Sequence, residues 1–181
     1  MFAMSDGQAT PAHPDAVVQG ARYRFTVLTS RLLRLEWHER GEFVDQPTQA
    51  VVNRGFEPVP FTVSETPDSL EIRTADLHLT YNKQPFSSAG LSVHLHRGAP
   101  DFHNSTWHYD DEPPQSLPWR GNLEGTARTV DEADGAVPLE PGILATYGFA
   151  VLDDSTSITL SADGWIEPRP AASESEPKDL Y

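Results

Sequence analysis

Residues 22–38, RYRFTVLTSRLLRLEWH, decide the fold of this chain. They contain two runs of alternating or β-branched character, 22–28 and 32–38, which are typical of half-buried β-strands. A three-residue break separates the two runs, and helix periodicity is nearly absent from the rest of the chain. Runs of the same strand-like character recur at 61–65, 70–74, 77–81, 91–95, 148–152 and 157–160.

Turn-forming residues stand between these runs. Thr66-Pro67-Asp68-Ser69 is one example, and it follows the run at 61–65. The chain also has 16 prolines and 12 glycines in 181 residues, which suits many short connections better than long helices. The sequence therefore predicts an all-β domain, an antiparallel β-sandwich of eight or more strands.

The charge balance limits the classes of partner. Lys and Arg number 13 against 27 Asp and Glu, a net charge of −14, so nucleic acid and anionic membranes would be repelled. The absence of cysteine excludes disulfides, thiolate metal sites and thiol catalysis. The first twenty residues have neither a basic start nor an apolar run, so no signal peptide is expected. We expect a cytoplasmic protein that binds neither nucleic acid nor membrane.

Few side chains suggest a metal or cofactor. His94 and His96 fall on the same face of one predicted strand, but no third ligand lies at a convincing spacing. Asp110, Asp111 and Glu112 form an acidic run that lacks the spaced oxygen pattern of a calcium loop. Surface histidines and solvated acids are the favoured interpretation, and no cofactor is expected.

A long irregular segment, 98–141, is rich in Pro, Gly, Asp and Trp. Its rings Trp107, Tyr109 and Trp119 stand among carboxylates, a combination that can bind sugars, although packing against a sheet is the favoured role. A pair of carboxylates can also hydrolyse glycosidic bonds, but the sequence places no two of them at the required separation. The candidate acids are Glu124, Asp131, Glu132 and Asp134.

Four segments together resemble one family. They are RFTVLTSRLLRLEW (24–37), FVDQPTQAVVNRGF (43–56), LEIRTADLHLTYNKQPFSSAGLSVHL (70–95) and GNLEGTARTVDEADGAVPLEPGILATYGFAVLDDS (121–155). In this order they are similar to the N-terminal domain of glycoside hydrolase family 31, the α-glucosidase and α-xylosidase family. The resemblance covers about residues 22–166.

This resemblance implies a β-sandwich of the galactose mutarotase-like fold that precedes a catalytic (β/α)₈ barrel. The family's catalytic aspartates lie in the barrel, at motifs without a counterpart here, so no catalytic residue is expected in this chain. The implied organisation is a flexible segment at 1–21, the sandwich at 22–166 and a linker at 167–181. Asp179-Leu180-Tyr181 resembles the lead into the first barrel strand.

The resemblance also implies a role for residues 121–135. In the family, a loop of this domain forms one wall of the substrate pocket at the mouth of the barrel. Arg128, Thr129 and Asp131 are the candidate substrate-binding residues, and the implied partners are the missing barrel and an α-glycoside. Two alternatives stay open: a plain surface turn in which Arg128 pairs with Asp131, and an autonomous carbohydrate-binding or structural β-sandwich.

Overall fold

A computed structural model describes residues 10–96, 106–111, 135, 142–145, 148–169 and 177–181. Within these residues the chain is nearly all β, with one short 3₁₀-helix, η1 (Pro14–Ala16), and no helix long and apolar enough to cross a membrane. The strands are β1 (Val17–Gln19), β2 (Tyr23–Thr29), β3 (Leu32–Trp37), β4 (Thr62–Glu65), β5 (Leu70–Arg73), β6 (Leu77–Tyr81), β7 (Leu91–Leu95), β8 (Thr106–His108), β9 (Thr159–Leu160), β10 (Ile166–Glu167) and β11 (Lys178–Leu180).

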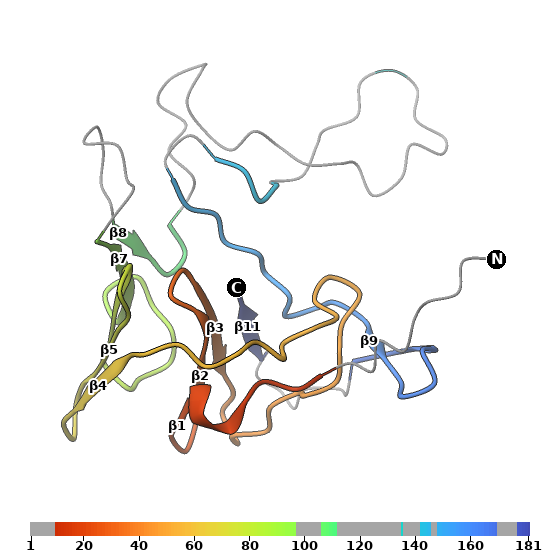
Figure 1. The fold of residues 1–181 in the computed structure, drawn as a ribbon, viewed down its shortest axis with the longest axis horizontal. Helices are drawn as coiled ribbons and strands as arrows, with labels where there is room; N and C mark the ends of the chain where they lie inside the picture. Colours follow the sequence, from red (N-terminus) through yellow and green to blue (C-terminus); the bar gives the residue numbers. More distant parts are fainter. Residues whose placement is uncertain (1–9, 97–105, 112–134, 136–141, 146–147, 170–176) are drawn as a thin grey trace.

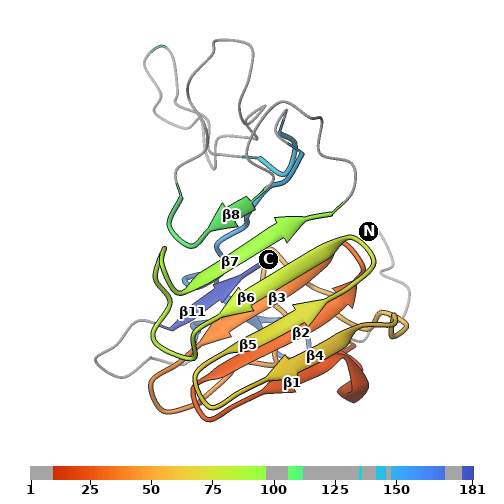
Figure 2. The same ribbon diagram turned by 90° about the vertical axis from the view of Figure 1, so that its left-hand side faces the viewer.

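Two antiparallel sheets form the body of the molecule. One has the strand order β1-β2-β3-β11 and the other β4-β5-β6-β7-β8, while β9 and β10 form a separate hairpin. Figure 2 shows the five-stranded sheet in front of the four-stranded sheet, and in Figure 1 the two layers are seen edge-on with β9 on the far side of the four-stranded sheet. The predicted all-β fold and antiparallel β-sandwich are confirmed.

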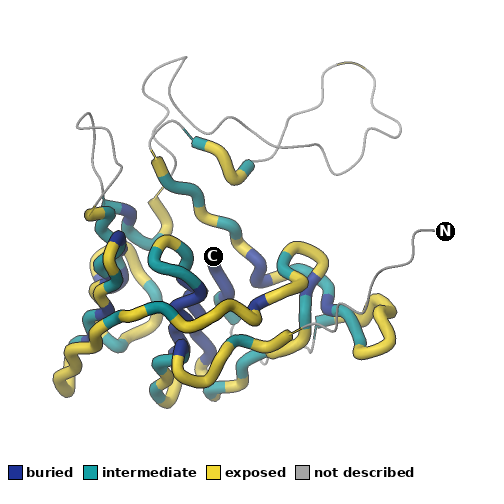
Figure 3. Tube along the Cα trace, in the orientation of Figure 1, coloured by how far each residue is buried: buried dark blue, intermediate teal, exposed yellow. Residues whose placement is uncertain are grey.

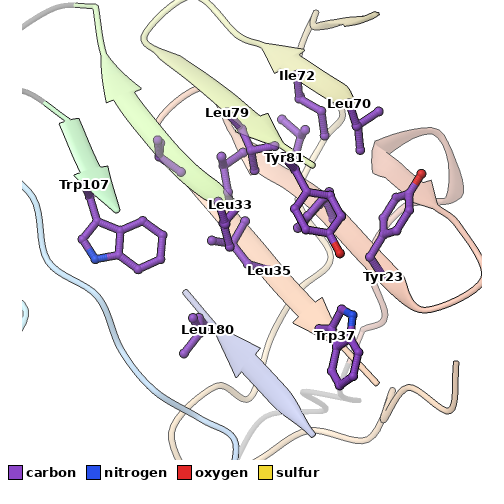
Figure 4. Packing of buried hydrophobic residues seen from close by; sticks show 14 residues of the cluster. Tyr23, Leu33, Leu35, Trp37, Leu70, Ile72, Leu79, Tyr81, Trp107 and Leu180 are labelled. Atoms are coloured by element: carbon purple, nitrogen blue, oxygen red, sulfur yellow. The ribbon is translucent and has the colours of Figure 1, made fainter. Parts of the chain in front are cut away.

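The apolar core lies between the two sheets and follows from the alternation in residues 22–38. Tyr23 and Phe25 on β2 face inward and stand opposite Trp37 and Leu35 on β3. The five-stranded sheet contributes Tyr81, whose ring meets that of Phe25 edge to face at 5.1 Å between centroids. Figure 4 shows these side chains converging from both sheets, with Leu180 of β11 at the lower side.

The outward face of β2 and β3 is buried as well. Strand alternation places Arg24 on β2 and Arg34 and Glu36 on β3, on the side away from the core, where solvent would be expected. All three are buried, because residues 42–56 and the region around Asp154 cover this face. A second, charged layer therefore lies behind the apolar one.

The strand assignments differ from the sequence pattern in four places. The expected flexible segment 1–21 contains η1 and β1, and β1 pairs with β2. The expected linker 167–181 contains β11, which pairs with β3. Residues 148–152 do not form the expected strand and instead run beside β11, with the N–H and C=O of Leu152 bonded to Tyr181. The irregular segment 98–141 contains β8, which extends the five-stranded sheet.

Candidate functional site

The substrate-binding residues predicted from the sequence, Arg128, Thr129 and Asp131, lie outside the described residues. The same holds for Trp119 and for the other carboxylates of that segment, Glu124, Glu132 and Asp134. Gly135 is the one described residue of the segment 121–135. It is exposed, and its φ of +106° lies in the region that favours glycine. The pocket-wall role of this loop stays a prediction.

The two described aromatic residues of the irregular segment belong to the core. Trp107 on β8 is buried, with 7% of its surface exposed, and Tyr109 packs against the same core cluster. The ring of Tyr109 also contacts that of Phe86 at 5.6 Å between centroids. The structure thus supports packing, the favoured interpretation, for both rings.

The acids and histidines considered as metal ligands give no metal centre in the described part of the chain. No three of its His, Asp and Glu side chains are placed to hold a metal ion. Asp111 accepts hydrogen bonds from the backbone N–H of His108 at 2.8 Å and lies 3.2 Å from its Nδ1, so it closes a turn. His94 on β7 and His96, which directly follows the strand, lie close together, with their ring centroids 5.5 Å apart.

A network of buried charges, which we call the charged layer, was not predicted from the sequence patterns. It is centred on Arg34, whose Nε and Nη2 donate to the two carboxylate oxygens of Asp179 at 2.8 and 2.7 Å. Arg24 binds Glu36 in the same bidentate geometry, with its Nε and Nη2 donating to the two carboxylate oxygens at 2.6 and 2.8 Å. Arg34 Nη2 also lies 3.1 Å from Glu36, which joins the two pairs. Its members are Arg24, Arg34, Arg54, Arg169, Glu36, Asp154 and Asp179.

The covering segments contribute the rest of the charged layer. Arg169 binds both Asp179 and the backbone carbonyl of Asp154. Arg54 donates to the hydroxyl of Tyr181. The fully buried Asp154 accepts from the hydroxyl of Thr48 at 2.8 Å. The layer therefore ties both covering segments to the end of β11.

Two opposing effects set the pKa values of the acids in the charged layer: burial raises them, and pairing with arginine lowers them. Burial alone would raise the pKa of Asp179, but the hydrogen bonds and charge of Arg34, followed by Arg169, outweigh it and lower that pKa. At Glu36 burial is the larger effect, so its pKa is raised despite Arg24 and Arg34. Burial also raises the pKa of Tyr181 to about 12.

The charged layer has the geometry of a structural element rather than of a catalytic pair. Glu36 and Asp179 both approach Arg34 and could be read as two acids of a hydrolase. Both side chains are almost completely buried and bound by guanidinium groups, so a sugar cannot reach them. Their contacts hold β11 and its covering segments in place.

An apolar cavity of about 240 Å³ lies between the two sheets. Leu33, Leu35, Val93, Trp107 and Phe149 are among the residues that line it. Arg31, Asp76 and Tyr181 also border the cavity, but most of its lining residues are apolar. A mainly apolar cavity between two sheets is better suited to an apolar group than to the hydroxyls of a sugar.

The β9–β10 hairpin carries the exposed apolar residues Trp165 and Ile166, with 76% and 68% of their surfaces accessible. The turn is held by hydrogen bonds, since Ser161 N–H donates to the carbonyl of Trp165 at 2.8 Å and its Oγ accepts from Trp165 N–H at 3.0 Å. Figure 3 shows the hairpin as an exposed projection on the side opposite β4. We call Trp165 and Ile166 the apolar tip.

No family model matches this chain, and no curated protein matches it.

Proposed function

We propose that this chain is the non-catalytic N-terminal β-sandwich of a retaining α-glycosidase. In this proposal the sandwich has the galactose mutarotase-like fold and packs against a (β/α)₈ barrel that the chain does not contain. Its loop at 121–135, with Arg128, Thr129 and Asp131, forms one wall of the barrel's α-glycoside pocket. Bond cleavage belongs to the barrel, and the sandwich shapes the pocket.

The apolar tip is the observation that carries the proposal. Large apolar side chains that are exposed on a turn held by hydrogen bonds are typical of a surface that another protein surface covers. Trp165 and Ile166 are neighbours on such a turn, which backbone hydrogen bonds from residues 47–49 to 158–160 also fix to the body of the domain. A missing barrel would cover this surface.

The charged layer also supports the proposal, because several of its residues come from the segments that carry the family resemblance. Arg34 and Glu36 come from the first resembling segment, Arg54 from the second and Asp154 from the fourth. Segments that are far apart in the chain thus contribute their charged residues to one connected network. This convergence is what a shared fold would require of these motifs.

A second function is favoured by one specific observation. An autonomous carbohydrate-binding sandwich needs an exposed aromatic platform, and the indole of Trp165 is exposed. The two functions differ in a direct test, because a platform would bind soluble α-glucan oligosaccharides in the isolated chain, whereas a docking surface would not. Loss of such binding in Trp165→Ala would establish the second function.

The isolated chain is expected to hydrolyse neither aryl α-glucosides nor aryl α-xylosides, because the proposed catalytic carboxylates lie in the barrel. Translation of the same reading frame beyond Tyr181 is expected to give a longer protein that hydrolyses one of them. Nitrophenol release by both proteins, purified in parallel, measures this. Turnover by the isolated chain, or a stop codon directly after Tyr181, would refute the proposal.

The isolated chain is also expected to self-associate through the apolar tip. Burial of each large apolar side chain contributes about 1.5–3 kcal/mol, so the double variant Trp165→Ser and Ile166→Ser should weaken association at least about tenfold. Sedimentation equilibrium measures the effect. Val63→Ser, which removes an exposed apolar side chain on the distant strand β4, is the matched control. A wild-type chain that stays monomeric at high concentration contradicts this prediction.

A further inference from the structure

Three histidines meet on the outward face of the five-stranded sheet. His78 on β6 stands directly opposite His94 on β7, and His96 follows two residues later on the same face. The ring of His96 stacks on that of His78 at 5.9 Å between centroids, with 11° between their planes, and meets the ring of His94 edge to face at 5.5 Å. His96 therefore contacts both of the other rings.

Hydrogen-bonding groups lie beside the rings of His78 and His94, whereas the ring of His96 is exposed. Glu71 on β5 binds Arg73 at 2.9 Å and lies 3.1 Å from Nε2 of His78. His94 Nδ1 lies 2.8 Å from the Thr106 hydroxyl on β8. Within the described part of the chain, the ring nitrogens of His96 have no hydrogen-bond partner, and the residue is exposed.

The remaining charged groups near this face lie at its edges. The carbonyl of Asp76 accepts from the backbone N–H of His96 at 2.7 Å, while its carboxylate binds Ser30 and Arg31 on the four-stranded sheet's side. His108 is paired with Asp111 at the end of β8.

Proton uptake by His96 turns this face from neutral to positive. With neutral histidines, the charge of Arg73 cancels that of Glu71, and a proton on His96 places a positive charge in contact with the rings of His78 and His94. The neighbouring rings partly desolvate the exposed His96, which lowers its pKa, and the positive charges of His94, His78 and Arg73 lower it further. An anion bound between the rings would remove this repulsion.

We propose that His78, His94 and His96, together with Arg73, form a binding site for a free divalent oxyanion of the sulfate type, which is taken up together with protons. Imidazolium and guanidinium groups are donors only, and their hydrogen bonds to oxyanions are charge-assisted. This inference is independent of the proposed glycosidase role. A metal ion is not the ligand, because no three described side chains are placed to hold one.

Titration with sodium sulfate, followed through the imidazole C–H resonances by NMR at pH 5.5 and pH 8, tests the site. Sulfate stays divalent over this range, so any pH dependence arises from the protein. We expect saturable shifts of the three ring signals at pH 5.5, an affinity at least about tenfold weaker at pH 8, and a rise in the pKa of His96 when sulfate is present. His96→Gln should weaken binding at pH 5.5 at least about tenfold.

Sodium chloride at equal ionic strength and the variant His13→Gln are the controls, since His13 lies in the N-terminal segment before η1. A second variant, Arg73→Gln, should weaken sulfate binding as well, and it decides the outcome if His96→Gln fails to fold. Two results would overturn the site. One is an equal response of the His13 and His108 ring signals to sulfate, which indicates screening only, and the other is unchanged affinity in the folded variants.

Discussion

Asp179→Asn is expected to destabilise the domain by about 3–5 kcal/mol, the usual cost of removing one partner from a buried ion pair. Asp179 is 1% exposed and accepts from Arg34 at 2.7 and 2.8 Å. The variant removes the carboxylate that the buried Arg34 shares with Arg169, and the Glu36 that stays beside Arg34 is already bound by Arg24. The melting temperature should fall by roughly 6–20 °C for a domain of this size. Thermal unfolding followed by far-ultraviolet circular dichroism measures the change.

The exposed ion pair Arg73–Glu71 provides the matched control for this buried one. Its N–O distance is 2.9 Å, close to that of the buried pair, but both side chains are substantially exposed. Glu71→Gln should therefore change the free energy of unfolding by less than about 1 kcal/mol. Equal effects of Asp179→Asn and Glu71→Gln would show that burial does not determine the strength of the charged layer.

The effect of Asp179→Asn should also depend on pH. Because the pKa of Asp179 is lower in the folded chain than in the unfolded chain, its stabilisation is present above the unfolded pKa of about 4. That stabilisation is lost as the pH falls from this value through the folded pKa. The difference between wild type and variant, measured by urea unfolding, should thus be constant from pH 6 to 7 and shrink below about pH 4.

The sequence predicted the central strands well because their two faces differ in polarity. Residues 77–81 and 91–95 were predicted with the bounds that β6 and β7 have in the structure. In both strands the buried residues alternate with polar ones, so the period-2 pattern is visible without tertiary information. The confirmed fold class follows from such runs.

The strand β11 could not be predicted from the same pattern. Lys178-Asp179-Leu180 contains one apolar residue, and its pairing with β3 depends on partners 145 residues earlier in the chain, such as Arg34 for Asp179. A strand of three residues forms mainly because the edge of a sheet is available for pairing. Its own sequence indicates little about which edge that is.

The charged layer was missed for a related reason. Arg34 and Glu36 alternate with apolar residues on β3, which indicates a solvent-facing side, and only the covering segment 42–56 turns that side into an interior. One signal was present, since charged residues of this layer lie in the segments on which the proposed family assignment rests. The predicted site residues Arg128, Thr129 and Asp131 lie outside the described residues, and their role depends on the tests of the extended protein.

Trp107→Ala and Trp165→Ala form a pair that separates packing from ligand contact, since one indole is 7% exposed and the other 76%. Trp107→Ala should cost about 3–5 kcal/mol, because the lost ring leaves a void that enlarges the neighbouring apolar cavity. Trp165→Ala should change stability by less than about 0.5 kcal/mol and instead weaken self-association. Urea unfolding and sedimentation measure both quantities on the same samples. A stable Trp107→Ala variant would contradict the core role of this ring and would restore sugar contact as its explanation.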